Sequence, residues 1–200
     1  KLSIINGHLI DPANQVDAKQ NLYIDNGRIM AIGQQPEGFI ADQTIDASNL
    51  IVCPGLIELS AHLSESGQHH TASIASETKA AIKGGITSLC IPPDHDPIID
   101  TPATVDLIED QAAKAGHAHV YTIGALTQGL QGELLSEMLA LKQAGCLGVS
   151  NGLNPIQNTL VLRRAMEYAA TLDPTLFINA ADPWLQSQGC IHEGMVSSRL

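Results

Sequence analysis

Histidine and carboxylate residues gather in two short stretches of the sequence, each at or directly after a run of apolar residues. The first stretch contains Glu58, His62, Glu65, His69 and His70, and the second contains Asp94, His95 and Asp96. Imidazole and carboxylate groups bind divalent metals in proteins and transfer protons near neutral pH. The residue types therefore suggest a metal centre, a paired general acid and base, or polar turns without catalytic chemistry.

The spacing favours the structural interpretation at most of these positions. His62 stands alone at the end of an apolar run, where a hydrogen-bonded structural histidine is the more common case, although it remains the candidate for a remnant metal ligand. His69 and His70 are adjacent, so their side chains diverge on a loop. His95 has acidic neighbours that suit a divalent ion, but the segment reads first as a polar turn. Glu58 lies within the apolar run, and strand alternation points it away from the His62 side.

From residue 54 onward, apolar runs alternate with amphipathic segments. The runs 56–62, 86–91, 119–125, 146–150 and 175–180 predict strands. The segments 73–83, 101–116, 133–144 and 160–170 predict helices. Strands joined by helices of this length form a parallel sheet, either an open doubly wound sheet or most of a (β/α)8 barrel. A barrel places its chemistry in the loops that follow the strands, so His117 and His119, at the start of the third strand, are expected to be structural.

The first part of the chain has a different pattern. Short strands are expected at 1–5, 22–24 and 28–32, separated by Asn6-Gly7 and by Asp25-Asn26-Gly27. An Asn-Gly pair between apolar strands is a strong hairpin signal, because both residues accept positive φ. We therefore expect a small β-sheet region that ends near residue 53.

Composition limits the partners and the compartment. Twenty-one acidic and ten basic residues give a formal net charge of −11, which argues against a nucleic acid or an anionic membrane as partner. No apolar run approaches the ~18 residues of a membrane span. Cys53, Cys90, Cys146 and Cys190 are far apart, which predicts reduced core thiols in a cytoplasmic protein. The chain begins without Met and ends in a helix-like segment, so we expect a fragment of a longer protein.

One motif resembles a known family. Pro54-Gly55-Leu56-Ile57-Glu58, with His62 a few residues later, is similar to the opening of the amidohydrolase superfamily and closest to the dihydroorotases. The segments 80–87, 92–100, 124–129 and 144–146 extend the resemblance along the chain. It implies an α/β fold, an amidohydrolase-type (β/α)8 TIM barrel. Five of its eight strands would lie in residues 54–200, and a small N-terminal β-sandwich region would lie in residues 1–53.

The positions that carry chemistry in that family differ here. The family has His-x-His-x-Arg after the first strand, whereas this chain has Ser60, His62 and Ser64. The departing positions on the later strands are Pro93, Asn151 and Asn179. A catalytic zinc needs three protein ligands of the nitrogen, sulfur or carboxylate type. The resemblance therefore implies a degenerate site, with no catalytic residue and no cofactor.

The same substitutions make the chain similar to the non-catalytic dihydroorotase homologues that accompany aspartate carbamoyltransferase in pyrimidine biosynthesis. The resemblance implies a pseudoenzyme that scaffolds this transferase in an oligomeric complex. One alternative is an active dihydroorotase, or a related cyclic amidase that uses zinc in an altered site. Another is a ligand-binding sensor that kept the pocket and lost the reaction. Metal ligands on the remaining barrel strands would favour the enzyme.

Overall fold

The computed structural model describes residues 1–63, 73–182 and 194–199. Contacts divide the chain into two compact units, Lys1–Gly55 and Leu56–Leu200. The sequence pattern placed this boundary between residues 53 and 54. No helix among the described residues is both long enough and apolar enough to cross a bilayer.

The first unit contains two small sheets. Its strands are β1 (Leu2–Ile5), β2 (His8–Asp11), β3 (Val16–Lys19), β4 (Leu22–Asp25), β5 (Arg28–Ile32), β6 (Gln43–Asp46) and β7 (Ile51–Val52), with a 3₁₀ turn, η1 (Pro12–Asn14). One sheet has the order β5-β4-β1-β6 and the other the order β3-β2-β7. Leu22, Tyr23 and Phe39 are buried, and the rings of Tyr23 and Phe39 meet edge to face at 5.4 Å.

Only one of the two expected Asn-Gly hairpins forms. Asn26 and Gly27 both have positive φ and join the antiparallel strands β4 and β5. The hairpin predicted at Asn6-Gly7 is wrong, because β1 and β2 on either side of it belong to different sheets. Of that pair, only Asn6 has positive φ (64°). A Cβ on Gly7 would lie 2.6 Å from Val52 Cγ2, so the glycine permits close packing against β7.

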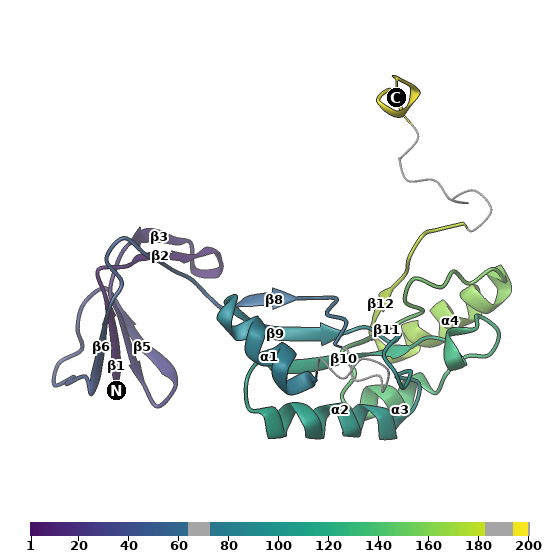
Figure 1. Cartoon of the computed structure of the whole chain (residues 1–200), viewed down its shortest axis with the longest axis horizontal. Coiled ribbons are helices and arrows are strands. Elements are labelled where there is room, and N and C mark those ends of the chain that lie inside the picture. Colours follow the sequence, from purple (N-terminus) through teal and green to yellow (C-terminus); the bar gives the residue numbers. More distant parts are fainter. Residues whose placement is uncertain (64–72, 183–193, 200) are drawn as a thin grey trace. The chain divides into compact units, whose positions relative to one another are not determined.

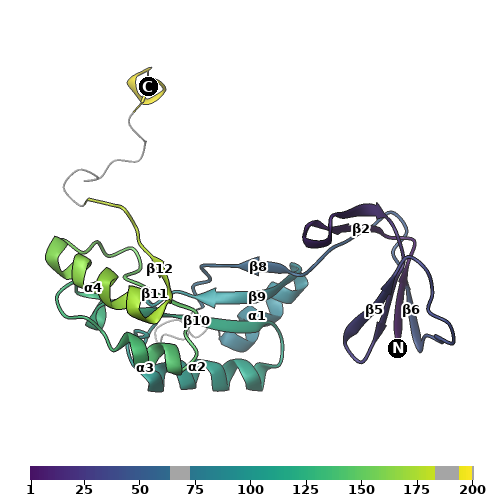
Figure 2. The ribbon, with the colours of Figure 1, turned by 180° about the vertical axis from the view of Figure 1, so that it is seen from behind.

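The second unit is a parallel five-stranded sheet with the order β12-β11-β10-β9-β8. Its strands are β8 (Leu56–Glu58), β9 (Ile86–Ile91), β10 (His119–Ala125), β11 (Gly148–Ser150) and β12 (Thr175–Phe177). Its helices are α1 (Ile74–Lys83), α2 (Pro102–Ala115), α3 (Met138–Gln143) and α4 (Thr159–Leu172), with 3₁₀ turns η2 (Gln128–Leu130) and η3 (Ser197–Arg199). Sequential strands are neighbours, and a helix lies between each pair from β8 to β12 (Figure 1). The reverse view shows α2 and α3 running along the same side of the sheet (Figure 2). This α/β arrangement is a parallel half-barrel sheet.

Several elements are shorter than the sequence predicted. The first strand ends at Glu58 instead of residue 62, because the Ser60 N–H donates to the side chain of Glu58 (Oε1) and not to a neighbouring strand. The fifth ends at Phe177 instead of residue 180. The third helix begins at Met138 instead of residue 133. The Ser136 hydroxyl donates to the Ala125 carbonyl and the Ser136 N–H to the Leu126 carbonyl, which ties the preceding residues to β10 and removes them from the helix.

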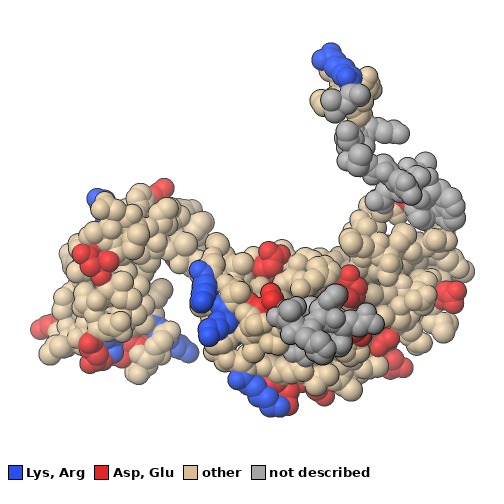
Figure 3. Space-filling view, in the orientation of Figure 1, with Lys and Arg blue, Asp and Glu red and all other residues tan. Residues whose placement is uncertain are grey.

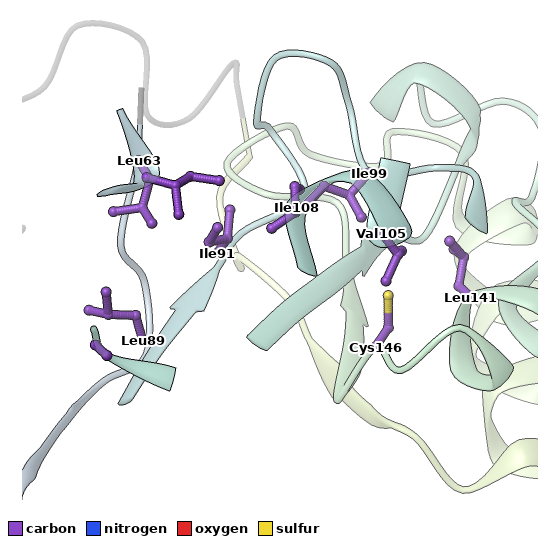
Figure 4. Close-up of a cluster of buried hydrophobic side chains, with 10 residues drawn as sticks. Leu63, Leu89, Ile91, Ile99, Val105, Ile108, Leu141 and Cys146 are labelled. Atoms are coloured by element: carbon purple, nitrogen blue, oxygen red, sulfur yellow. The ribbon is translucent and has the colours of Figure 1, made fainter. Parts of the chain in front are cut away.

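Apolar side chains from the helices and strands form the core of this unit. Ile91, Val105, Ile108 and Leu141 belong to one buried cluster with Cys146 (Figure 4). A second cluster joins Leu126, Met138, Val149, Ala165 and Ala169. Burial of such side chains contributes roughly 1.5–3 kcal/mol each. The core holds the strands in position, and the positions of the strands determine where the polar side chains at their carboxyl ends lie.

Candidate functional site

The carboxyl ends of the parallel strands surround a cavity of about 510 Å³, called here the strand-end cavity. It is lined by Leu59, Ser60, His62, Pro92, Pro93, Asp94, Ile123, Ser150, Gly152, Leu153, Leu176, Phe177, Ile178 and Asn179. Parallel strands place functional side chains at this end of a sheet. The fold therefore brings together four of the site positions expected from the sequence: Ser60, His62, Pro93 and Asn179.

The other expected positions lie elsewhere. Ser64 falls outside the described residues, as do Glu65, His69 and His70. Asn151 follows β11, and its side chain lines a neighbouring cavity of about 400 Å³ instead of the strand-end cavity. The residue that β11 delivers to the strand-end cavity is Ser150, whose hydroxyl accepts a hydrogen bond from the Gly152 N–H at 3.0 Å.

Asn151 serves as a structural residue. It is buried, its Oδ1 accepts from the Thr127 hydroxyl at 2.6 Å, and its Nδ2 donates to the Asn154 carbonyl at 2.9 Å. Side chains of consecutive residues leave an extended chain on opposite sides. This alternation shows that Ser150 and Asn151 cannot both face the cavity, and the prediction from the sequence did not use it. Which of the two side chains faces the cavity depends on the register of β11 in the sheet, and the sequence alone does not give this register.

The titratable pair of the strand-end cavity is His62 with Asp94. Asp94 Oδ1 lies 3.8 Å from His62 Nδ1, at the outer limit for an ion pair. The histidine side chain is 59% exposed and the aspartate side chain 29% exposed. Gly152 (φ 60°) approaches the same loop, since a Cβ built on it would lie 3.5 Å from Asp94 Cγ. An exposed pair of this separation contributes little to stability.

The remaining histidines lie outside this cavity. His95 is buried in the loop after β9, with Nδ1 3.4 Å from the Pro97 carbonyl oxygen, so the loop is the turn that the sequence favoured. Its Nε2 is buried without a hydrogen-bond partner among the described residues. His117 and His119 are exposed at the start of β10, the opposite end of the strand from the cavity.

Cys90 and Cys146 are not suited to metal binding or nucleophilic chemistry. Burial raises the pKa of Cys90, and the Glu58 carboxylate raises it further. Burial also raises the pKa of Cys146, although a hydrogen bond with Thr122 lowers it in part. Raised pKa values keep these thiols protonated at neutral pH. Cys53 is exposed, so its expected place in the core is wrong. Cys190 falls outside the described residues.

The donor groups do not fit a catalytic zinc. Within residues 1–63, 73–182 and 194–199, no three His, Cys, Asp or Glu side chains lie close enough to share a metal ion. The strand-end cavity supplies the two potential ligands His62 and Asp94, and its other polar groups are hydroxyls and a carboxamide. Neutral oxygen donors of this kind do not replace imidazole at zinc. We therefore derive no metal-dependent step from this part of the chain.

Charged side chains do not form one continuous field on the visible surface. On the face in Figure 3, acidic residues are scattered and separated by uncharged atoms, and the basic residues lie in a few separate places. Two of the ion pairs, Arg163 with Glu167 and Lys114 with Asp110, are local contacts on α4 and α2. The acidic side chains on this face are therefore dispersed.

Solved structures with a similar fold include hydantoinases. The L-hydantoinase (dihydropyrimidinase) from Arthrobacter aurescens superposes with a TM-score of 0.74 at 18% identity, over 91% of this chain and 41% of that structure. The D-hydantoinase from Bacillus sp. AR9 gives a TM-score of 0.66 at 20% identity, over 90% of this chain and 39% of that structure. At these identities the likeness concerns the fold alone.

Sequence comparison is more specific. The dihydroorotase-like protein of Pseudomonas aeruginosa is 47% identical over 199 residues, which is 100% of this chain and 47% of that protein. The dihydroorotase of Syntrophotalea carbinolica is 38% identical over 200 residues, again 47% of its length. The chain thus spans about half the length of these relatives. The family model described as dihydro-orotase-like matches residues 49–200, and the chain therefore belongs to the dihydroorotase-like family.

Proposed function

We propose that this protein is a non-catalytic dihydroorotase homologue that scaffolds aspartate carbamoyltransferase in pyrimidine biosynthesis. The observation that carries the proposal is the composition of the strand-end cavity. It has a single imidazole and a single carboxylate among the described residues, where hydrolysis of a cyclic amide needs a metal-activated water. The buried core is intact, and Ser73 and Asn158 cap α1 and α4, so the sequence maintains the fold while the chemistry at the strand ends is lost.

We also propose how the fold is completed in the whole protein and where in the cell the protein is located. The half-barrel sheet would be completed by further strands to a (β/α)8 barrel, and the sheets of the first unit would belong to a small β-sandwich. The completed barrel is supported by the open, parallel order of β8 to β12 and by relatives of about twice the length. The sandwich is supported by the two separate sheets of the first unit. The buried, unpaired thiols of Cys90 and Cys146 support a cytoplasmic location.

Co-expression of the whole protein with the aspartate carbamoyltransferase of the same organism tests the scaffold role. We expect the two to elute together from gel filtration at micromolar concentration, and the transferase to assemble poorly when expressed alone. The net charge of −11 predicts that the partner presents basic residues at the edge of the interface. Association should therefore become slower as salt rises. Separate elution, together with full transferase activity without the partner, would refute the scaffold.

A second candidate function is an active dihydroorotase or related zinc-dependent cyclic amidase. It is favoured by relatives of 36–39% identity that carry the name dihydroorotase. In this case His62 and Asp94 do not suffice, and further metal ligands must come from outside the described residues. Intact histidine and aspartate ligands on the remaining barrel strands would favour the enzyme, and their loss would favour the scaffold.

A further inference from the structure

The strand-end cavity is acidic. Among its described lining residues, the carboxylate of Asp94 has His62 as its titratable neighbour, and no lysine or arginine is present. A carboxylate ligand would meet a fixed carboxylate in this cavity and no cation from these residues. Like charges in a partly water-excluded site repel each other strongly.

The rest of the lining suits an apolar body. Leu153, Phe177 and Ile178 all face the cavity and remain partly exposed in it. Aromatic faces such as that of Phe177 also attract organic cations. A volume of about 510 Å³ falls within the common range for small-molecule sites, roughly 300–1,000 Å³. Size, apolar lining and one carboxylate together define the class of ligand.

We propose that the strand-end cavity binds a small organic cation with an apolar body, whose ammonium group pairs with Asp94. The inference rests on the proposed absence of a metal, because a bound divalent ion would reverse the charge of the site. The cavity should therefore bind cations in preference to anions, whereas a site for carboxylates prefers anions. The site would act as a sensor, without turnover.

Two probes of similar shape and opposite charge test this inference. The whole protein, with its zinc content measured, is titrated with benzylammonium and with benzoate at about pH 8, where an ordinary histidine is neutral. Binding is followed by protein chemical-shift changes in NMR spectra. We expect benzylammonium to bind with a Kd on the order of 1 mM, typical of a ligand of this size, and benzoate to bind at least about fivefold more weakly.

The variant Asp94→Asn should weaken benzylammonium about fivefold or more. Asp106→Asn on the exposed side of α2 changes the net charge equally and lies outside the cavity, so it should leave binding unchanged. Benzoate binding as tight as that of benzylammonium, or equal effects of the two variants, would overturn the inference in a zinc-free protein. Binding of neither probe would also overturn it.

The zinc measurement separates this inference from the proposed function. Stoichiometric zinc with tight benzoate binding would overturn both. Stoichiometric zinc with preferred benzylammonium binding that depends on Asp94 would overturn the absence of metal from the protein. It would still support the cation site, because it would show that the zinc lies outside the strand-end cavity. A zinc-free protein that prefers benzoate would overturn the cation site and leave the scaffold role standing.

Discussion

The Thr127 hydroxyl donates a 2.6 Å hydrogen bond to Asn151 Oδ1, and both side chains are buried. Asn151 Nδ2 donates to the carbonyl oxygens of Asn154 at 2.9 Å and Leu130 at 3.4 Å. The side chain of Asn151 therefore joins the loop after β10 to the loop after β11. At the end of the fourth barrel strand, where the resemblance implied a lost metal ligand, the chain has a structural hydrogen-bond centre.

The first prediction is that Asn151→Asp destabilises the fold and does not create a metal ligand. A carboxylate can accept from Thr127, but it cannot donate to the two carbonyl oxygens, and it adds a buried charge beside them. The free energy of unfolding should fall by about 2 kcal/mol or more, measured by urea denaturation. The same amide-to-acid change at exposed Gln157 should alter it by less than about 0.5 kcal/mol. Equal stabilities of the two variants would contradict the structural role of Asn151.

Much of the half-barrel was predictable because local signals coincide with tertiary structure. The strands at 86–91 and 119–125 match the predicted bounds residue for residue. Helix α2 begins at Pro102, the expected N1 residue, and ends before Gly116, which has φ 64°. Proline at N1 and glycine past the end are local preferences of the backbone, so no tertiary information is needed to place them.

The errors occur where distant residues determine the structure. The start of α3 depends on the hydrogen bonds of Ser136 to the carbonyl groups of Ala125 and Leu126. The conformation of Asn6-Gly7 depends on the packing of Gly7 against Val52. The site shows the same limit. The residue types predicted that the metal site of the family is lost, but the choice between Ser150 and Asn151 as the cavity residue depends on the pairing of β11 with its neighbours.

The second prediction concerns zinc. The whole protein, purified without added metal, should carry far less than one zinc per chain by elemental analysis, because Ser60, Ser150 and Asn179 are neutral donors around a single histidine–aspartate pair. Extensive dialysis of a zinc-incubated sample serves as the control for loosely bound ion. Near-stoichiometric zinc that survives dialysis would contradict the prediction and direct attention to His69, His70 or His95.

The third prediction concerns thiol labelling. In a Cys190→Ser background, an aromatic disulfide reagent should modify exposed Cys53 at least about tenfold faster than buried Cys90 and Cys146. Burial hinders access and, by raising the pKa of both buried thiols, reduces their thiolate fraction. In urea, all three should react at similar rates. Fast labelling of Cys146 in the folded protein would show that its cluster opens readily.

The fourth prediction follows from the sign of the pKa shift of Cys146. Burial raises the folded-state pKa above the unfolded value of about 8.5, so the folded chain holds the proton more tightly. The stability from this group is fully present below the unfolded pKa and is lost as pH rises through the folded pKa. The free energy of unfolding should therefore decrease as the pH rises above about 8.5. The decrease should be smaller in Cys146→Ala but unchanged in Cys53→Ala. An equal slope in all three proteins would contradict this assignment.

The last prediction is that the whole protein neither forms nor opens dihydroorotate above background, even with zinc or manganese supplied. Two defects act independently. No described cluster holds a metal that could activate water, and the position that resembles the substrate-binding arginine of the family is Ser64. Loss of one partner of a buried charge contact costs roughly 2–5 kcal/mol, so Ser60→His alone should not restore turnover. The measurement is the absorbance of dihydroorotate in both directions of the reaction, with a catalytic dihydroorotase as the positive control. A rate above about 1 s⁻¹, within the ordinary range for enzymes, would establish the protein as an enzyme and refute the proposed loss of catalysis.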